Sequence, residues 1–330
     1  MNKAKQAKKP IIFVLSIDTE EEWDWSGPFP QRHGDVQNIL QVPAFHTILS
    51  SFNIRPTYFV DYAVLETAQS IENMQRVIQQ QNCEIGAHMH PWCNPPYFGD
   101  VGEAQSHVIN LPVEEVAAKV KALVSKIEQT LDVTPKSFRS GRWGIDGKVM
   151  NLLFQNGFNV DSSVYPYYKN EFFSCIGSPP TPYWAALDKP LEQTTVQNMF
   201  EVPVTVGFNR ENFDFWNRVH YLFTQPPLSW TRFNGFAWHT RLMRKNYLCP
   251  ELSSVADMIN LCDIAIDKGY PMLHMYMHSS SLLENRNNML GQSNAFNHLC
   301  GSIEQVVSYL EKNYEVEFCT ISEAADKLKS

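Results

Sequence analysis

Long apolar runs, paired cysteines and excess positive charge are all missing from this sequence. No apolar run approaches the length of about 18 residues that a transmembrane helix needs, so we predict none. The net charge of −8 argues against nucleic acid or an anionic membrane surface as the main partner. The basic start, MNKAKQAKKP, precedes an apolar run too short for a signal peptide. We therefore expect a frayed tail, a first strand and a cytoplasmic protein.

The cysteines are seven in number, scattered, and include no CxxC pair. This pattern is typical of reduced thiols and not of a disulfide framework or a structural zinc site. Cys93 follows two histidines discussed below, and we interpret it as a core or wall residue, with metal contact as the alternative. With 44% apolar and 12% aromatic residues, the chain can bury a large core.

Strand-like and helix-like segments alternate along most of the chain, which is typical of βαβ units. The rhythm is lost from about 161 to 250, a stretch rich in Pro, Tyr, Phe and Trp, where we expect loops and short strands, including EVPVTV at 201–206. Since both ends supply α/β elements, we predict one barrel-like domain over 1–330 with an insertion at 165–250. The expected strands are 11–17, 56–60, 83–90, 137–141, 271–278 and 315–321, and the expected helices are 41–51, 62–81, 113–131, 146–156, 251–268 and 301–313.

The first strand, IIFVLSI, is apolar on both faces and ends in the acidic run DTEEE. Parallel α/β folds place their chemistry at the carboxyl ends of strands. Asp18 and Glu20 are two residues apart, so in extended chain they share a face, where one can hold a metal and the other move protons. A solvated acidic loop is the alternative.

His88 and His90 also share a strand face, and Pro91 ends that strand. Two neutral imidazoles plus one carboxylate form a ligand set that suits Zn²⁺ or a related ion. Two hydrogen-bonded structural histidines are the alternative, and the acidic strand end at Glu20 favours the metal.

Two further strand ends carry polar groups. In FRSGRWG (138–144), Arg139 can keep a nearby carboxylate ionised, and the glycines let backbone amides approach a substrate oxyanion. A tight turn with surface arginines explains this motif equally well. In LHMYMHSSS, His278 lies where a general acid is needed, whereas His274 is interpreted as structural. Asp161 can orient Arg139 or His278, or simply form a turn. Structural or surface roles are expected for His33, His46, His107, His220, His239 and His298.

The order of these motifs resembles the polysaccharide deacetylase family, the chitooligosaccharide-deacetylase-like carbohydrate esterase family 4. The resemblance covers about 11–165 and 265–325 and is greatest to deacetylases of lipopolysaccharide or exopolysaccharide synthesis. It implies a distorted (β/α) barrel with fewer than eight regular strands and one divalent ion, with zinc preferred. The matching segments are SIDTE, TYFV, EIGAHMHPW, FRSGRWG, DSSVYP and LHMYMHSSS.

Carried over by position, the resemblance makes Asp18 the base, tethered by Arg139, and His278 the acid. Glu20, His88 and His90 become metal ligands, and an amide near Arg142 or Trp143 binds the oxyanion. The sequence departs from the family's usual motifs in three places. Asp-Thr-Glu replaces the usual pair of aspartates, and the two histidines are two residues apart where most members space them four apart. In the arginine motif, Gly-Arg stands where proline and an aromatic residue are usual.

The implied reaction removes an N-acetyl group from a sugar of a surface-polysaccharide precursor, carried on a nucleotide or a lipid. Trp23, Trp25 and the aromatic insertion would stack on sugar rings or belong to the core. The alternatives are an allantoinase-like cyclic-amide hydrolase of the same superfamily and an inactive, carbohydrate-binding member. The sequence names neither the sugar nor the oligomeric state.

Overall fold

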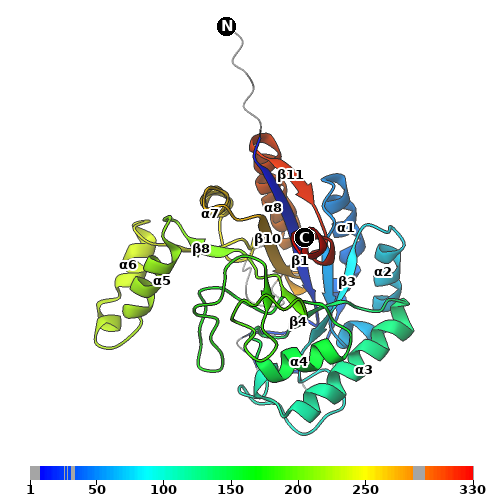
Figure 1. Cartoon of the computed structure of the whole chain (residues 1–330). Coiled ribbons are helices and arrows are strands. Elements are labelled where there is room, and N and C mark those ends of the chain that lie inside the picture. The colour runs from blue at the N-terminus through cyan, green and yellow to red at the C-terminus, as the bar shows by residue number, and fades with distance from the viewer. Residues whose placement is uncertain (1–7, 26, 28, 31–33, 285–293, 330) are drawn as a thin grey trace.

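A curled, mostly parallel β-sheet lies at the centre of the chain (Figure 1). This computed structural model describes residues 8–25, 27, 29, 30, 34–284 and 294–329. Along the sheet the strands run in the order β10-β1-β2-β3-β4-β5-β7-β6, and β11 pairs with the first half of β1. The strands are β1 (Pro10–Thr19), β2 (Thr57–Val60), β3 (Glu84–Met89), β4 (Ser137–Ser140), β5 (Val160–Asp161), β6 (Tyr183–Ala185), β7 (Met199–Glu201), β8 (Val206–Phe208), β9 (Lys245–Tyr247), β10 (Met272–His278) and β11 (Glu315–Phe318).

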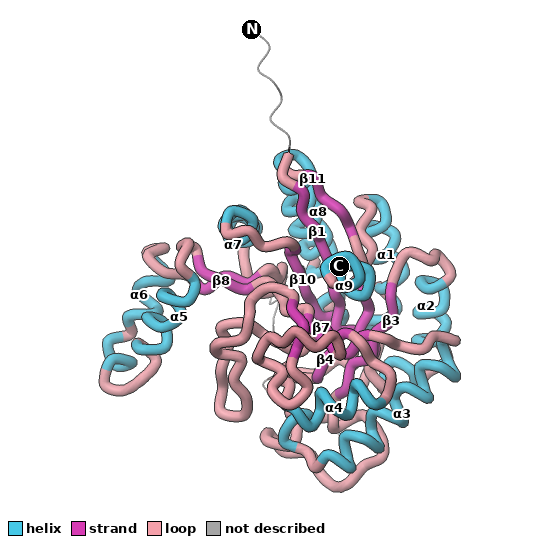
Figure 2. Tube along the Cα trace, viewed as in Figure 1, coloured by secondary structure: helices cyan, strands magenta, loops and turns pink. Residues whose placement is uncertain are grey.

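Helices surround the strands, as Figure 2 shows. Within the main sheet the strands from β10 to β7 pair in parallel, and of its described strands only β6 pairs antiparallel. This arrangement confirms the predicted α/β fold, a distorted barrel. The α-helices are α1 (Val42–Ser51), α2 (Ala68–Ile78), α3 (Val113–Leu131), α4 (Gly147–Gln155), α5 (Phe213–Leu222), α6 (Phe233–His239), α7 (Val255–Asp267), α8 (Ala295–Asn313) and α9 (Ile321–Leu328); short 3₁₀ helices are η1 (Gln37–Leu40), η2 (Ala63–Leu65), η3 (Val108–Asn110), η4 (Leu228–Thr231) and η5 (Ser279–Leu282).

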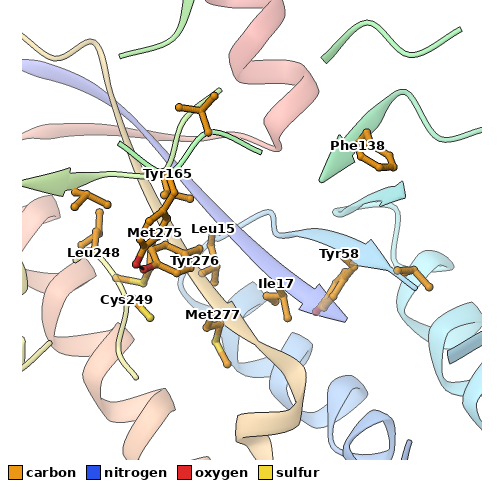
Figure 3. Close-up of a cluster of buried hydrophobic side chains, with 14 of the residues drawn as sticks. Leu15, Ile17, Tyr58, Phe138, Tyr165, Leu248, Cys249, Met275, Tyr276 and Met277 are labelled. Atoms are coloured by element: carbon orange, nitrogen blue, oxygen red, sulfur yellow. Dashed lines mark hydrogen bonds between the residues drawn. The ribbon is translucent and has the colours of Figure 1, made fainter. Parts of the chain in front are cut away.

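The two longest strands, β1 and β10, are buried along most of their length. Their register pairs Ile12 with Met272 and continues to Asp18 with His278. Leu15, Met275 and Met277 have no exposed surface and meet side chains from the neighbouring strands (Figure 3). Because both faces of these strands are covered, most of their residues are apolar, which is the pattern that identified them in the sequence.

The barrel is completed between β7 and β10 by an irregular segment, residues 202–205. Its Thr205 amide donates to the His274 carbonyl at 3.1 Å, so the segment lies along β10 without forming a ladder. The predicted strand at 201–206 is therefore wrong: only its two ends belong to β7 and β8. Pro203 explains the interruption, because proline has no N–H to donate to a neighbouring strand.

Several helix predictions need correction. The predicted helix 62–81 is divided into η2 and α2, because Thr67 caps α2 by accepting a hydrogen bond from the Ser70 amide. The stretch expected to hold only loops and short strands contains α5 and α6, and β6 and β7 join the main sheet. The last long helix begins at Ala295, six residues earlier than predicted. The prediction of one domain with an insertion at 165–250 stays a prediction.

None of the described helices is long and apolar enough to cross a membrane. Residues 1–7 of the expected N-terminal tail and the position of His33 lie outside the described residues, and Pro10, the last residue of that expected tail, belongs to β1.

The final helix, α9, was not predicted and depends on a capping box. Thr320 accepts a hydrogen bond from the Glu323 amide, and the Glu323 carboxylate accepts one from the Thr320 amide at 3.0 Å. Thr320→Ala removes the first bond, so we expect it to lower the free energy of unfolding by about 1 kcal/mol. Urea denaturation measures this change.

Thr47→Ala is the matched control. Thr47 lies within α1, and its hydroxyl only donates to the Pro43 carbonyl in the preceding turn. The change should alter stability by less than about 0.5 kcal/mol. Equal effects of the two substitutions would contradict the capping role of Thr320.

Candidate active site

Four strand ends that are far apart in the sequence bring polar side chains together at one end of the barrel. The register places Asp18 of β1 beside His278 of β10, and His88 of β3 beside Arg139 of β4. All four residues are buried. The convergence that the sequence motifs predicted is therefore present in the structure.

Arg139 is fully buried and makes an ion pair with Asp18, at 2.5 Å between Nη1 and Oδ1. Its remaining donors reach the Ser16 hydroxyl at 2.8 Å and the carbonyl and hydroxyl of Ser162 at 3.0 and 2.9 Å. The Phe59 ring lies 4.4 Å from the guanidinium carbon. Burial raises the pKa of Asp18, but the charges of Arg139, His88 and His278 outweigh it and lower that pKa below its usual value. Asp18 is therefore held as a carboxylate in a fixed orientation.

Glu20, His88 and His90 form a buried group with the spacing of metal ligands. Oε2 of Glu20 lies 3.5 Å from Nε2 of each histidine. A tetrahedral ion with bonds near 2.1 Å separates its ligands by about 3.4 Å, so these atoms fit one divalent ion. Oε2 of Glu20 and Nε2 of His90 are buried without any described hydrogen-bond partner, which is costly unless something else binds them.

The far nitrogens of both imidazoles are already occupied. Nδ1 of His88 is 3.0 Å from the Arg139 carbonyl, and Nδ1 of His90 is 3.0 Å from Oε2 of Glu21. These partners fix the proton on Nδ1 and turn the Nε2 lone pair toward Glu20, which is how proteins orient metal-binding histidines. Glu20 is itself held by the Ser279 hydroxyl, which accepts from the Glu20 amide at 3.0 Å.

Behind His90 lies a second buried group that the sequence analysis missed. The carboxylate of Glu21 accepts from the Trp92 indole at 2.5 Å, and the Cys93 thiol lies 3.7 Å from Glu21 and 3.6 Å from Asp61. Burial raises the pKa of Glu21, but His90 and the surrounding hydrogen bonds lower it overall; burial and Glu21 together raise the pKa of Asp61. Glu21 is thus the ionised member that supports His90. Cys93 is buried beside both carboxylates, and because Glu21, Asp61, His90 and Cys93 also have the spacing of metal ligands, its role as a wall residue stays a prediction.

His278 is held by Glu251, another residue that the sequence analysis did not single out. Its Nδ1 lies 2.8 Å from Oε2 of Glu251, and its Nε2 points toward Asp18 at 3.9 Å. Burial lowers the pKa of His278, but Glu251, followed by Glu20 and Asp18, raises it to about 10. The imidazole therefore carries a proton at neutral pH. Glu251 lies 27 residues before its partner in an irregular segment, where no local pattern signals it.

The turn after β4 has an unusual backbone. Arg142 and Trp143 both have positive φ, at 62° and 63°, in a region that residues other than glycine rarely adopt. Trp143 donates its amide to the Ser140 carbonyl at 3.1 Å, so this amide is not available to a substrate. Of the two amides predicted to bind an oxyanion, only that of Arg142 donates to no described atom.

A cleft of about 400 Å³ is lined by His278 and by Arg142 and Trp143 of this turn, whereas Asp18 and the Glu20, His88 and His90 group do not line it. We call it the aromatic cleft. Trp25 contacts the edge of His278, with ring centroids 5.4 Å apart, and Trp143 packs on Tyr165 at 4.8 Å. Arg142, which pairs with Glu103 at 2.8 Å, also lines the cleft. The lining residues are Trp25, His107, Arg142, Trp143, Tyr165, Tyr168, Asn170, Phe173, Tyr247, Leu252, Tyr276 and His278.

Two predicted site residues lie elsewhere. Trp23 does not line the cleft, because it is buried against Phe29 and Trp92, and only 6% of its surface is exposed. Asp161 does not hydrogen-bond to Arg139 or His278; it accepts from Ser163, while its neighbour Ser162 holds Arg139. The register explains this, because side chains at successive strand positions point to opposite faces.

The remaining histidines fit structural roles in part. His274 accepts from Ser16 at 2.8 Å and donates to the Pro203 carbonyl at 3.1 Å; burial and Arg139 lower its pKa to about 3. His107 was assigned no site, yet it lines the aromatic cleft and stacks on Phe172 at 5.0 Å.

No family model and no curated protein matches this chain. Solved structures do. A protein designated a glycoside hydrolase/deacetylase from Parabacteroides distasonis is similar with a TM-score of 0.63 and 12% identity, over 98% of this chain and 72% of that chain. A protein designated a polysaccharide deacetylase from Mycobacterium smegmatis is similar with a TM-score of 0.54 and 14% identity, over 99% of this chain and 92% of that chain. The allantoinase PuuE is similar with a TM-score of 0.53 and 14% identity, over 98% of this chain and 90% of that chain.

These similarities establish the class of fold, that of polysaccharide deacetylases and structurally related hydrolases. Because an allantoinase shares it, the fold does not decide the reaction. The reaction has to be argued from the site.

Gly141 offers a test of the metal-binding geometry. A Cβ atom at this position would collide with Cδ2 of His90 and with the Met89 carbonyl. We expect Gly141→Ala to displace the His90 ring and to weaken Zn²⁺ binding by about 10- to 100-fold, as changes to the support of a metal ligand do. Competition with a chromophoric chelator measures the affinity.

Gly301→Ala is the control, because an added Cβ there meets nothing within 4 Å. This variant should bind Zn²⁺ like the unmodified chain. Unchanged affinity in a folded Gly141→Ala protein would show that His90 is not a ligand.

Proposed function

We propose that the protein is a metal-dependent hydrolase that removes the N-acetyl group from a sugar. The observation that carries this proposal is the pair of buried, unpartnered ligand atoms, Oε2 of Glu20 and Nε2 of His90, beside a carboxylate fixed by Arg139. A divalent ion bound by Glu20, His88 and His90 would polarise the acetyl carbonyl and lower the pKa of a water molecule.

The protein's own groups account for the proton transfers. Asp18, kept ionised by Arg139, accepts a proton from the attacking water as its oxygen bonds to the carbonyl carbon. The Arg142 amide, which donates to no described atom, would donate to the oxyanion. His278, protonated at neutral pH, then donates its proton to the sugar nitrogen as the carbon–nitrogen bond breaks, which releases acetate and a free amine.

The aromatic cleft supports a saccharide as the substrate. Aromatic rings stack on the apolar faces of sugars, while Arg142 and Asn170 supply polar contacts. We further propose that the substrate is a precursor of a surface polysaccharide or lipopolysaccharide and that the reaction takes place in the cytoplasm. The seven cysteines support a reducing compartment, since all seven are free.

An acetate-release screen over N-acetylated nucleotide sugars and oligosaccharides tests the reaction. We expect activity that depends on about one Zn²⁺ per chain, and a loss of about 10²- to 10⁴-fold in Asp18→Asn with the metal retained. His88→Ala should lose both metal and activity, whereas His298→Ala, on the exposed surface of α8, should keep both.

Three outcomes would redirect the proposal. Acetate release unchanged in Asp18→Asn would remove Asp18 as the base. A metal-free protein that opens cyclic amides would favour the allantoinase-like alternative. Sugar binding without acetate release would indicate an inactive member of the superfamily.

Glu251→Gln tests the assignment of the acid. The Glu251 carboxylate stabilises protonated His278, so its removal lowers the pKa of His278 from about 10. The basic limb of the pH profile of kcat should therefore move to lower pH, by at least about one unit. Glu315→Gln, at an exposed position in β11, should leave the profile unchanged. An unmoved basic limb in Glu251→Gln would exclude His278 as the group it reports.

A further inference from the structure

One part of the chain takes no part in the site, the α5–α6 hairpin, which we define as residues 209–244. It leaves the barrel through β8 and returns through the antiparallel strand β9. In Figure 1 both helices stand away from the main sheet. Within the hairpin, the Phe223 and Phe233 rings pack with centroids 4.1 Å apart, and Asn234 donates to the His220 carbonyl at 3.0 Å. The hairpin therefore has internal packing of its own.

The hairpin exposes an unusual amount of apolar surface. Of the twelve large apolar side chains that are exposed among the described residues, six belong to it. Trp230, in η4 at its tip, is 79% exposed, and Phe236 is 61% exposed. Exposed apolar side chains that gather in one part of a folded surface are a feature of binding faces. The six are Phe215, Leu222, Trp230, Phe236, Trp238 and Leu242.

The charge of the hairpin is opposite to that of the whole chain. It carries five basic and two acidic residues, a net charge of +3 in a chain of net charge −8. Arg210, Arg218, Arg232 and Arg241 are exposed and form no ion pair with any described carboxylate, whereas Arg244 pairs with Asp257 at 3.0 Å. On α5, Phe215, Arg218 and Leu222 recur at positions that share one helix face.

We propose that the α5–α6 hairpin docks the enzyme on an anionic membrane surface. Exposed Trp and Phe with arginines among them are the combination that inserts at the boundary between lipid headgroups and acyl chains. The excess positive charge then adds attraction to anionic lipids. The net charge of the whole chain, −8, argued against an anionic membrane surface as a partner, but it does not reveal the positive charge of the hairpin.

The position of the hairpin connects docking to the site. A second cavity of about 360 Å³ is lined by Tyr221, Thr224 and Gln225 at the end of α5, and by Lys245 of β9. It shares Tyr168, Asn170 and Tyr247 with the aromatic cleft. On the function proposed above, a docked enzyme meets an acetylated sugar that is carried on a lipid.

Co-sedimentation of the full chain with lipid vesicles tests this proposal. We expect binding to vesicles of phosphatidylcholine mixed with phosphatidylglycerol to be at least about tenfold tighter than binding to phosphatidylcholine alone, and to weaken as salt is added. Arg218→Glu with Arg232→Glu should remove the preference for anionic lipid. Trp230→Ser with Phe236→Ser should reduce binding to both kinds of vesicle.

Phe98→Ser with Phe154→Ser is the matched control, because these exposed apolar residues lie outside the hairpin. It should bind vesicles like the unmodified chain. All variants should keep the thermal unfolding midpoint and the rate of acetate release from a soluble substrate.

Two results would overturn the proposal. One is the absence of vesicle binding, or equal binding to neutral and anionic vesicles. The other is a dimer in sedimentation velocity that dissociates in Trp230→Ser with Phe236→Ser, because a second copy would then cover the hairpin. Vesicle binding is measured without substrate, so its failure is distinct from a failure of the proposed deacetylation.

Discussion

The buried ion pair between Arg139 and Asp18 is the interaction on which the site depends. It joins β4 to β1 across β2 and β3, and the backbone carbonyl of the same arginine fixes His88. One residue thus orients both the proposed base and a proposed metal ligand. Removing one partner of such a pair leaves a buried charge alone, at a cost of about 3–5 kcal/mol.

A line of hydrogen bonds continues from this pair across the barrel. Arg139 donates to Ser16, Ser16 donates to His274, and His274 donates to Pro203 in the segment that completes the barrel. Neutral His274 can both accept and donate, which a charged imidazole beside Arg139 could not do. The irregular segment is therefore positioned by polar contacts, where a regular ladder is missing.

The sequence was most informative where a residue's neighbours in the chain determine its environment. The apolar run of β1 and the alternation that pairs His88 with His90 identify strands and faces directly. Glu251 and Ser162 could not be found this way, because their importance comes only from contacts with His278 and Arg139 in the folded chain. Asp161 was misplaced for the same reason, since a turn pattern does not show which neighbour faces the site.

Composition was a poorer guide than local pattern in the stretch from 165 to 250. Its aromatic residues have three different environments, which the number of aromatic residues in the sequence does not distinguish. Tyr165 lines the cleft, Phe213 is buried in the core, and Trp230 is exposed at the tip of the hairpin. Likewise Asn212 caps α5 with its side chain, a local signal that the abundance of prolines and aromatics obscured.

The ribbon formed by β8 and β9 has an evolutionary consequence. Because Val206 pairs with Tyr247, the chain enters and leaves the hairpin at one place on the barrel. A segment whose two ends lie side by side can be lengthened, shortened or exchanged while the barrel strands keep their pairing. Related barrels could thus differ in this one peripheral hairpin and in what it binds, while the arrangement of the site stays the same.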